Sequence, residues 1–287
     1  MKRYRAILGL CMVWLMVGCG SASDPFDDSS SSLSRLSFIA WDGVENYESL
    51  LEKTPNYDAP IVYLNPVDSE QNLFVENSEV LQAKGSDVWY LMSGSQSLYP
   101  PNSYLQEQIT LMENYNNTHS QPLLGMSLDI EVWTTFEEQN SSANQSAWQE
   151  YLDYLTQTKA SLHEKGLKLS VMVPYWLHFI DEAFPNGYPL DQAIVDIADE
   201  VVVMAYSSDK ERVFEEALPW LAYAKSVNKR VKVAIEMEPS SEEGISFYQT
   251  PEGVEPLVKT AIPYDSFGGY VIHTLDAFVQ SGVVIRR

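Results

Sequence analysis

The sequence predicts an α/β fold in which eight parallel strands, each followed by a helix, close into a (β/α)8 TIM barrel. Short apolar runs alternate with helix-patterned segments from residue 36 to the C-terminus. Several of these runs lack polar alternation, which is typical of parallel strands buried on both faces. Aromatic and acidic residues follow the runs, and barrel proteins gather their functional side chains at the carboxyl ends of the strands.

The expected strands are the apolar runs rich in β-branched and aromatic residues. They cover residues 36–41, 60–64, 87–92, 123–131, 167–173, 200–206, 230–236 and 268–273. The expected helices cover residues 44–53, 76–84, 102–115, 144–165, 190–198, 211–227 and 252–261. A doubly wound open sheet is the alternative, but Trp41-Asp42-Gly43 follows the first strand where that fold usually has a glycine-rich turn.

Residues 1–18 are expected to form a signal peptide. Three basic residues precede an apolar core at 6–17 that is too short to span a membrane as a mature helix. The core ends at Cys19 in a pattern that resembles a bacterial lipoprotein signal, so we expect cleavage before Cys19 and a lipid on its sulfur. Ordinary secretory cleavage near residues 21–23 is the alternative. The resemblance implies a cell-envelope protein, anchored in the outer membrane.

Residues 19–35 are rich in serine and aspartate and are expected to form a flexible tether. Residues 36–287 then form one barrel domain. Because Cys11 leaves with the signal and Cys19 carries the lipid, the mature protein keeps no cysteine pair for a disulfide. An exported domain of this size can rely on its apolar core instead.

The formal net charge of −22 bears on the partners of the protein. Nucleic acid is excluded as a partner, because its binding depends on lysine and arginine neutralising phosphates. An acidic polysaccharide is disfavoured, and a neutral or amino-bearing one is favoured. Solubility and self-repulsion at a surface explain the same charge equally well.

The segment from Leu123 to Trp133 is the most informative in the chain. An apolar run ends in Asp129 and Glu131, whose spacing puts both side chains on one side of a strand at its carboxyl end. Trp133 follows directly. Paired carboxylates beside an aromatic ring suit the cleavage of glycosidic bonds, which needs a proton donor, a stabilising charge and a face for the sugar.

Similar side chains follow the other strands. We expect substrate contacts from six of them, although the aromatic ones also suit core packing: Trp41, Trp133, Tyr175, Trp176, His273 and Asp276. Tyr206 and Glu236 end the sixth and seventh strands and are expected at the catalytic centre, with Glu238 as an alternative to Glu236.

In these motifs the chain resembles the glycoside hydrolase family 18 (chitinase-like) barrels. The fourth-strand motif of that family, D-G-x-D-x-D-x-E, is matched at Gly125, Asp129 and Glu131, with Leu124 and Ser127 in place of the first two acids. The resemblance implies that Glu131 is the general acid. It also implies that Asp129 orients and stabilises a substrate acetamido group that acts as the nucleophile.

Two further motifs of the family are matched in part. The sixth-strand pattern M-x-Y-D is met by Met204 and Tyr206, and the resemblance implies that Tyr206 donates a hydrogen bond to the substrate. The last-strand pattern G-G-x-x-x-W-x-x-D is met at Gly268, Gly269 and Asp276, with His273 in place of the tryptophan. With Ser127 in the fourth-strand motif, Asp129 lacks the acidic neighbour that it has in the family. With His273 in the last-strand motif, the sugar lacks the tryptophan ring on which it stacks in the family.

Glu236 offers a second mechanism. Glutamates at the ends of strands four and seven resemble the acid/base and nucleophile of another large clan of barrel glycosidases. Two carboxyls about 5 Å apart give retention and a separation of about 6.5–9.5 Å gives inversion. No metal or cofactor is expected, because the histidines are scattered and no His-x-His follows the first strand.

The sequence thus favours an envelope-anchored glycoside hydrolase acting on a polysaccharide. Glu131 is its general acid, and either Asp129 or Glu236 is the partner. A non-catalytic carbohydrate-binding lipoprotein with a degenerate cleft is the alternative, and a structural envelope lipoprotein without a ligand is a third.

Overall fold

The computed structural model describes residues 35–41, 43–66, 71–94, 99–100, 102–136, 144–180, 188–260 and 262–286. The predicted signal peptide and all of the predicted tether except Arg35 lie outside these ranges, as does Cys19. No helix within the described ranges is long and apolar enough to cross a bilayer.

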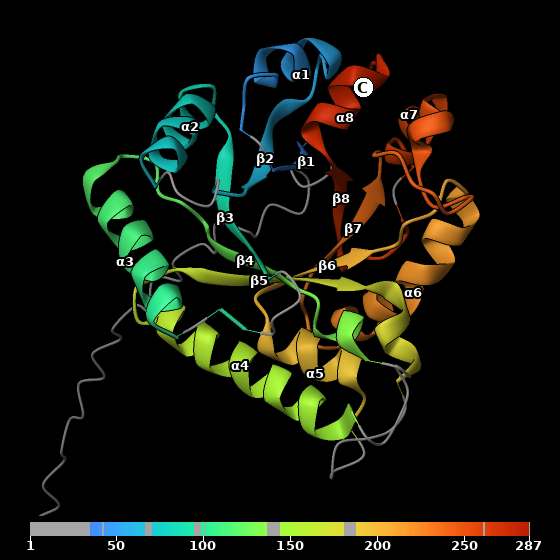
Figure 1. Cartoon of the computed structure of the whole chain (residues 1–287). Coiled ribbons are helices and arrows are strands. Elements are labelled where there is room, and N and C mark those ends of the chain that lie inside the picture. Colours follow the sequence, from blue (N-terminus) through green and yellow to red (C-terminus); the bar gives the residue numbers. More distant parts are fainter. Residues whose placement is uncertain are drawn as a thin grey trace, which may run out of the picture.

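Eight parallel strands form a closed barrel in chain order, and β8 pairs with β1 to close it (Figure 1). The strands are β1 (Arg35–Ala40), β2 (Asp58–Leu64), β3 (Asp87–Gly94), β4 (Gly125–Ile130), β5 (Lys168–Pro174), β6 (Glu200–Met204), β7 (Val231–Glu236) and β8 (Phe267–His273). Each expected strand is present with its ends within two residues of the prediction. The TIM barrel is confirmed, and the open-sheet alternative is excluded.

The helices lie outside the ring of strands (Figure 1). They are α1 (Tyr47–Lys53), α2 (Gln71–Ala83), α3 (Asn102–Thr118), α4 (Gln145–His163), α5 (Leu190–Ile197), α6 (Lys210–Ser226), α7 (Val254–Val258) and α8 (Leu275–Ser281). The sequence analysis missed α8. The Thr274 side chain accepts a hydrogen bond from the backbone N–H of Ala277 at its start, and Gly282 ends it with a φ of 77°.

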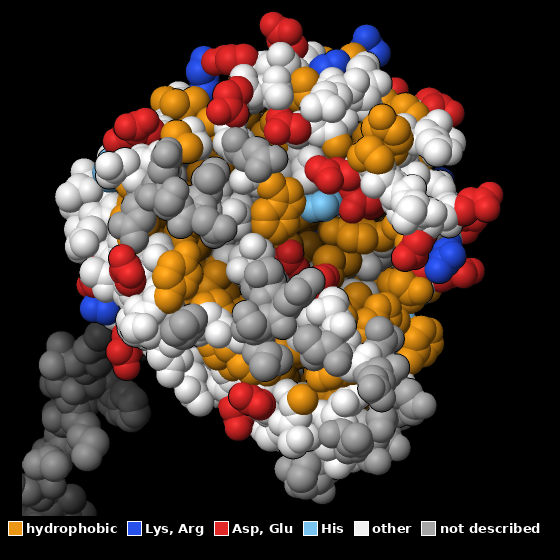
Figure 2. Space-filling model, in the orientation of Figure 1, with side chains coloured by type: hydrophobic (Ala, Val, Ile, Leu, Met, Phe, Trp, Pro, Cys, Tyr) orange, Lys and Arg blue, Asp and Glu red, His pale blue; other side chains and the backbone are white. Residues whose placement is uncertain are grey.

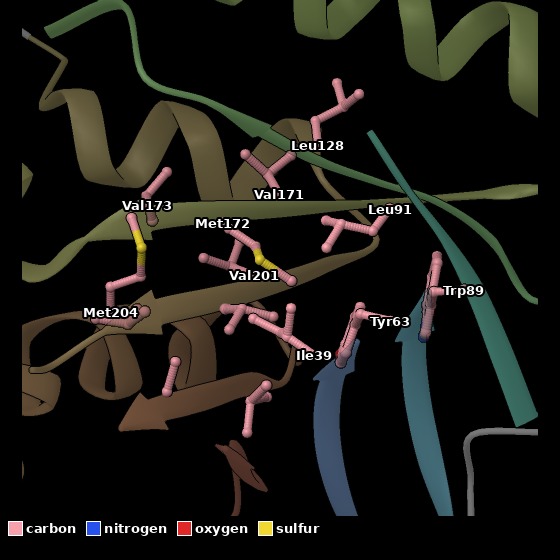
Figure 3. Close-up of a cluster of buried hydrophobic side chains, with 14 of the residues drawn as sticks. Ile39, Tyr63, Trp89, Leu91, Leu128, Val171, Met172, Val173, Val201 and Met204 are labelled. Atoms are coloured by element: carbon pink, nitrogen blue, oxygen red, sulfur yellow. The ribbon is translucent and has the colours of Figure 1, made fainter. Parts of the chain in front are cut away.

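Buried apolar side chains pack on both faces of the strands (Figure 3). Tyr63 of β2 and Trp89 of β3 stack with ring centroids 6.1 Å apart and planes 8° from parallel. Every residue of β6 and β7 is buried, which explains why these strands show no polar alternation. The filled interior leaves the carboxyl-end rim as the place where side chains can meet a ligand.

A polar cluster lies inside the barrel at the amino ends of the strands. Glu200, the first residue of β6, accepts hydrogen bonds from the Tyr63 hydroxyl at 2.5 Å and the Ser170 hydroxyl at 3.2 Å. The ammonium of Lys232 lies 3.2 Å from the Glu200 carboxylate and donates to the Tyr63 hydroxyl at 2.9 Å. Burial lowers the pKa of Lys232, although the charge of Glu200 opposes this effect. Each buried charge thus has a partner, as burial requires.

Strand register sets which side chains meet at the rim. Ser93 at the end of β3 pairs with Asp129 on β4. On the other side of the barrel, Glu236 of β7 pairs with His273 of β8, and His273 pairs with Ile39 of β1. The carboxyl ends of β7, β8 and β1 therefore stand side by side. Trp41 follows Ile39 by two residues and so lies at the same part of the rim.

Candidate active site

Asp129 lies near the carboxyl end of β4, where Gly125 allows β4 to approach β5 closely. A Cβ atom on Gly125 would lie 2.0 Å from the carbonyl oxygen of Lys168, so no larger residue fits. Strand alternation then turns Ser127 and Asp129 to the same side. The hydroxyl of Ser127 and the Oδ1 atom of Asp129 are both buried without a hydrogen-bond partner among the described residues.

The environment of Asp129 favours its protonated form. Burial, followed by the charge of Glu131, raises the pKa of Asp129 from 3.8 to about 7, and His273 acts in the opposite direction. An ionised carboxylate needs the solvation that burial removes, and no hydrogen bond from the described residues replaces that solvation at Oδ1. Asp129 can therefore carry a proton near neutral pH.

Glu131 is the first residue after β4 and stands before the short 3-10 helix Val132–Thr135. Its backbone carbonyl accepts hydrogen bonds from the Thr134 N–H at 3.1 Å and the Thr134 hydroxyl at 2.7 Å. Burial raises the pKa of the Glu131 side chain, and His273 opposes the shift. A fixed backbone and a raised pKa are what a general acid near neutral pH needs.

Glu236, His273 and Trp41 form a hydrogen-bonded chain across three neighbouring strands. The indole N–H of Trp41 donates to Nε2 of His273 at 2.7 Å. Nδ1 of His273 lies 2.8 Å from Oε2 of Glu236, whose Oε1 accepts from the backbone N–H of Glu238 at 2.6 Å. Because Nε2 accepts from the indole, the imidazole proton is on Nδ1 and is donated to Glu236. Both oxygens of Glu236 are therefore occupied.

The charge state of His273 reflects opposing effects. Burial lowers its pKa, but the hydrogen bond and charge of Glu236, with the charges of Glu238 and Asp129, outweigh burial and leave the pKa raised. The indole of Trp41 acts against that rise, because protonation of Nε2 would break the hydrogen bond from Trp41. We therefore treat the neutral imidazole as the form in this geometry.

Tyr206 lies against the same histidine. Its ring is stacked on His273 with centroids 5.9 Å apart and planes 26° from parallel. Burial raises the pKa of the phenol well above its usual value, and the charges of Glu236, Asp129 and Glu131 add to the rise. The hydroxyl stays protonated and has no hydrogen-bond partner among the described residues, so it can donate to a ligand near these carboxylates.

Trp133 occupies a different position from the one predicted. Only 4% of its surface is exposed, and its ring packs against Trp148 and Tyr151 of α4 and edge-on against Trp176. It is a core residue in place of the sugar-facing one that the sequence suggested, because the 3-10 helix after Glu131 turns it inward. Trp176 is only partly buried and keeps some exposed surface.

Two other predicted contacts lie toward the periphery. The hydroxyl of Tyr175 is 3.5 Å from a guanidinium nitrogen of Arg212 on α6, so this ring end lies against a helix. Asp276, in the first turn of α8, accepts a hydrogen bond from the Asn46 amide at 2.8 Å. Asp276 is separated from the β4 carboxylates by the chain of Glu236, His273 and Trp41.

Asp276 instead lines a hollow of about 260 Å3 beside that chain, with Trp41, Glu238, Tyr248 and Thr274. The sequence analysis missed Tyr248 and Thr274. Neither lies within a strand, so the alternation of side chains along a strand could not indicate them. Tyr151 of α4 also lies near the β4 carboxyls. Its buried hydroxyl has no hydrogen-bond partner among the described residues, and burial, together with the charges of Asp129 and Glu131, raises its pKa.

The face in Figure 2 has acidic side chains around a histidine near its middle, next to hydrophobic side chains, while lysine and arginine stand toward its edge. No group of three or more histidine, cysteine, aspartate and glutamate side chains in the described ranges is arranged to hold a metal ion. The proton donors and acceptors that the described residues bring to this rim include the carboxyls of Asp129, Glu131 and Glu236, the imidazole of His273 and the phenol of Tyr206.

Solved structures with a fold similar to this closed (β/α)8 barrel include chitinases, one of them of glycoside hydrolase family 18. A GH18 chitinase from Pseudoalteromonas aurantia is 14% identical over 86% of this chain and 99% of its own, with a TM-score of 0.51. A chitinase from Chromobacterium violaceum is 15% identical over 86% of this chain and 97% of its own, with a TM-score of 0.53.

The C-terminal domain of a putative chitinase from Desulfitobacterium hafniense is 14% identical over 71% of this chain and 66% of that chain, with a TM-score of 0.52. No protein-family model and no curated protein matches the sequence. At these identities the likeness concerns the fold alone, and it supports the (β/α)8 barrel that the sequence predicted.

Proposed function

We propose that the protein is a glycoside hydrolase that acts on a polysaccharide, with Glu131 as general acid and Asp129 as its partner. The observation that carries this proposal is the pair itself: two neighbouring carboxyls, both with raised pKa values, one of them with a buried oxygen that has no hydrogen-bond partner in the described chain. Such an unsatisfied group costs stability and suits a site that completes its hydrogen bonds with substrate.

In the proposed reaction, Glu131 gives its proton to the glycosidic oxygen as the bond from that oxygen to the anomeric carbon breaks. The acetamido oxygen of the substrate bonds to the anomeric carbon, and Asp129, in its ionised form, accepts a hydrogen bond from the acetamido N–H and stabilises its developing positive charge. Ionised Glu131 then removes a proton from water as the water attacks the anomeric carbon and releases the acetamido oxygen. Tyr206 donates a hydrogen bond to the acetamido group.

Glu236 is supported as a positioning group more than as a nucleophile. Its two oxygens accept hydrogen bonds from the Glu238 N–H and from His273. Attack on a sugar would require one of these bonds to lengthen, whereas Asp129 has an unoccupied oxygen. This favours substrate-assisted chemistry over a covalent intermediate on Glu236.

The second candidate is a carbohydrate-binding protein without catalysis. The observation in its favour is Ser127, whose small hydroxyl stands where the family motif has an acid and leaves Asp129 without a partner. Glu131→Gln separates the two candidates, because the amide keeps the shape but has no proton to transfer.

The test is the release of reducing ends from a panel of polysaccharides, together with a binding measurement. If the protein is an enzyme, Glu131→Gln lowers hydrolysis by about 10²–10⁴-fold while oligosaccharide binding persists. Glu215→Gln, at an exposed position on α6, is the matched control. Binding without hydrolysis of any substrate by the wild-type chain would establish the binding protein instead.

We also propose that Cys19 is lipidated and holds the barrel at the cell envelope, most simply at the outer membrane. The support is the sequence pattern of residues 1–19. Metabolic labelling with a fatty acid, followed by membrane fractionation, tests it. Cys19→Ala should abolish the label and release the protein from the membrane fraction, and an unlabelled wild-type protein would contradict the proposal.

A further inference from the structure

We propose that the hollow beside the Glu236–His273–Trp41 chain binds a sugar unit that carries a protonated amine. The hollow is lined by Trp41, Glu238, Tyr248, Thr274 and Asp276 and has a volume of about 260 Å3. The inference rests on the proposed function, because it treats the hollow as an extension of the hydrolytic site that selects the substrate.

Aromatic surface suited to a sugar borders the hollow. The Trp41 indole is partly buried, and its N–H is held by His273 at 2.7 Å, so the ring is fixed before a ligand arrives. Tyr248 is 51% exposed. Aromatic rings bind the apolar faces of sugars, and tryptophan also attracts a cation held over its face. These properties point to a carbohydrate with a positive group.

Two carboxylates supply the charge that an ammonium would meet. Oε1 of Glu238 accepts from the Thr274 hydroxyl at 3.0 Å, and Oδ1 of Asp276 accepts from the Asn46 amide at 2.8 Å. Each carboxylate is thus oriented by a neutral donor. No lysine or arginine of the described chain forms an ion pair with either, and none lines the hollow.

The surrounding field has the same sign. Glu236 accepts a hydrogen bond from the backbone N–H of Glu238, and Asp129 and Glu131 both interact electrostatically with His273. A neutral sugar can donate hydrogen bonds from its hydroxyl groups to these carboxylates. Only a cationic sugar also offsets the negative charge of the hollow. An acidic sugar is disfavoured for the same reason.

The test compares two probes of equal length, the tetramer of glucosamine and the tetramer of N-acetylglucosamine. Their binding is measured by calorimetry at pH 6 and low salt, with Glu131→Gln as the background so that neither probe is cleaved. We expect the glucosamine tetramer to bind at least about 10-fold more tightly, the order of magnitude of one charge-assisted hydrogen bond.

Glu238→Gln and Asp276→Asn, each added to that background, should remove most of this preference and change binding of the acetylated probe by less than about 2-fold. Glu242→Gln is the matched control, because Glu242 is exposed, lies on the same loop and does not line the hollow. It changes the net charge equally and therefore measures the general attraction of an acidic protein for a cation.

Equal affinity for the two probes, or an equal effect of Glu238→Gln and Glu242→Gln, would overturn the inference. Hydrolysis by the wild-type protein is measured separately, on the polysaccharide panel. Hydrolysis without the amine preference would overturn the inference alone. Failure of both hydrolysis and binding would overturn the proposed function with it.

Discussion

Relative to the wild type, the Asp129→Asn variant should gain stability as the pH rises. It should also lose activity. The pKa of Asp129 is raised from 3.8 to about 7, mainly by burial. The folded state therefore holds the proton more tightly than the unfolded state does. The stabilising contribution of the protonated carboxyl is complete below about pH 4 and is lost as the pH rises through about 7.

The size of the effect follows from that difference in pKa. Roughly three pKa units at about 1.4 kcal/mol each give roughly 4 kcal/mol. This is an upper limit, because Asp129 is only partly buried by surface area and its charge is coupled to that of Glu131. Asparagine cannot ionise, so the gap in unfolding free energy between variant and wild type should shift in favour of the variant by about 2–4 kcal/mol between pH 4 and pH 8.5.

Urea unfolding at a series of pH values measures this shift, with Glu242→Gln as the control in which an exposed carboxylate is removed. Any loss of packing in Asp129→Asn is independent of pH and cancels from the comparison. A gap that stays constant from pH 4 to pH 8.5 would refute the reasoning, since it would mean that Asp129 ionises as easily in the folded chain as in the unfolded one.

Three further substitutions test other parts of the structure. Glu200→Gln leaves the buried ammonium of Lys232 without its counter-charge and should lower the unfolding free energy by about 3–5 kcal/mol in urea titrations; a change near zero would contradict the buried ion pair. Gly125→Ala places a methyl group against the Lys168 carbonyl and should cost about 1–3 kcal/mol in the same assay, whereas an unchanged midpoint would mean that β4 and β5 separate freely. Tyr206→Phe should lower kcat about 10-fold or more with unfolding free energy unchanged within about 0.5 kcal/mol, and an unchanged kcat would remove Tyr206 from the site.

The strands could be predicted because they are short apolar runs buried on both faces, and the β4 carboxyls because side chains alternate along a strand with a two-residue period. Within β4, this period placed Asp129 correctly at the carboxyl end of a buried strand. The alternation stops where the strand stops. Trp133 lies in the 3-10 helix that begins directly after Glu131, so the direction of its side chain could not be extrapolated from the strand. The direction of the Tyr175 side chain could not be predicted for the same reason, because Tyr175 begins a 3-10 helix directly after β5.

Interactions between distant segments were also beyond the sequence. The indole of Trp41 and the imidazole of His273 are separated by 232 positions, and only the closure of β8 onto β1 brings them together. Residue types at strand ends identified both side chains as candidates for the site. The residue types did not reveal that these two side chains are hydrogen-bonded to each other, because hydrogen-bond geometry depends on side-chain direction at the rim.

The inward position of Trp133 has a consequence for how this protein can change. Its indole packs against Trp148 and Tyr151 of α4 only two residues beyond Glu131, so the backbone that carries this carboxyl is tied to the core of the barrel. If Glu131 is the proton donor that we propose, substitutions elsewhere on the rim can alter sugar preference while the acid keeps its place.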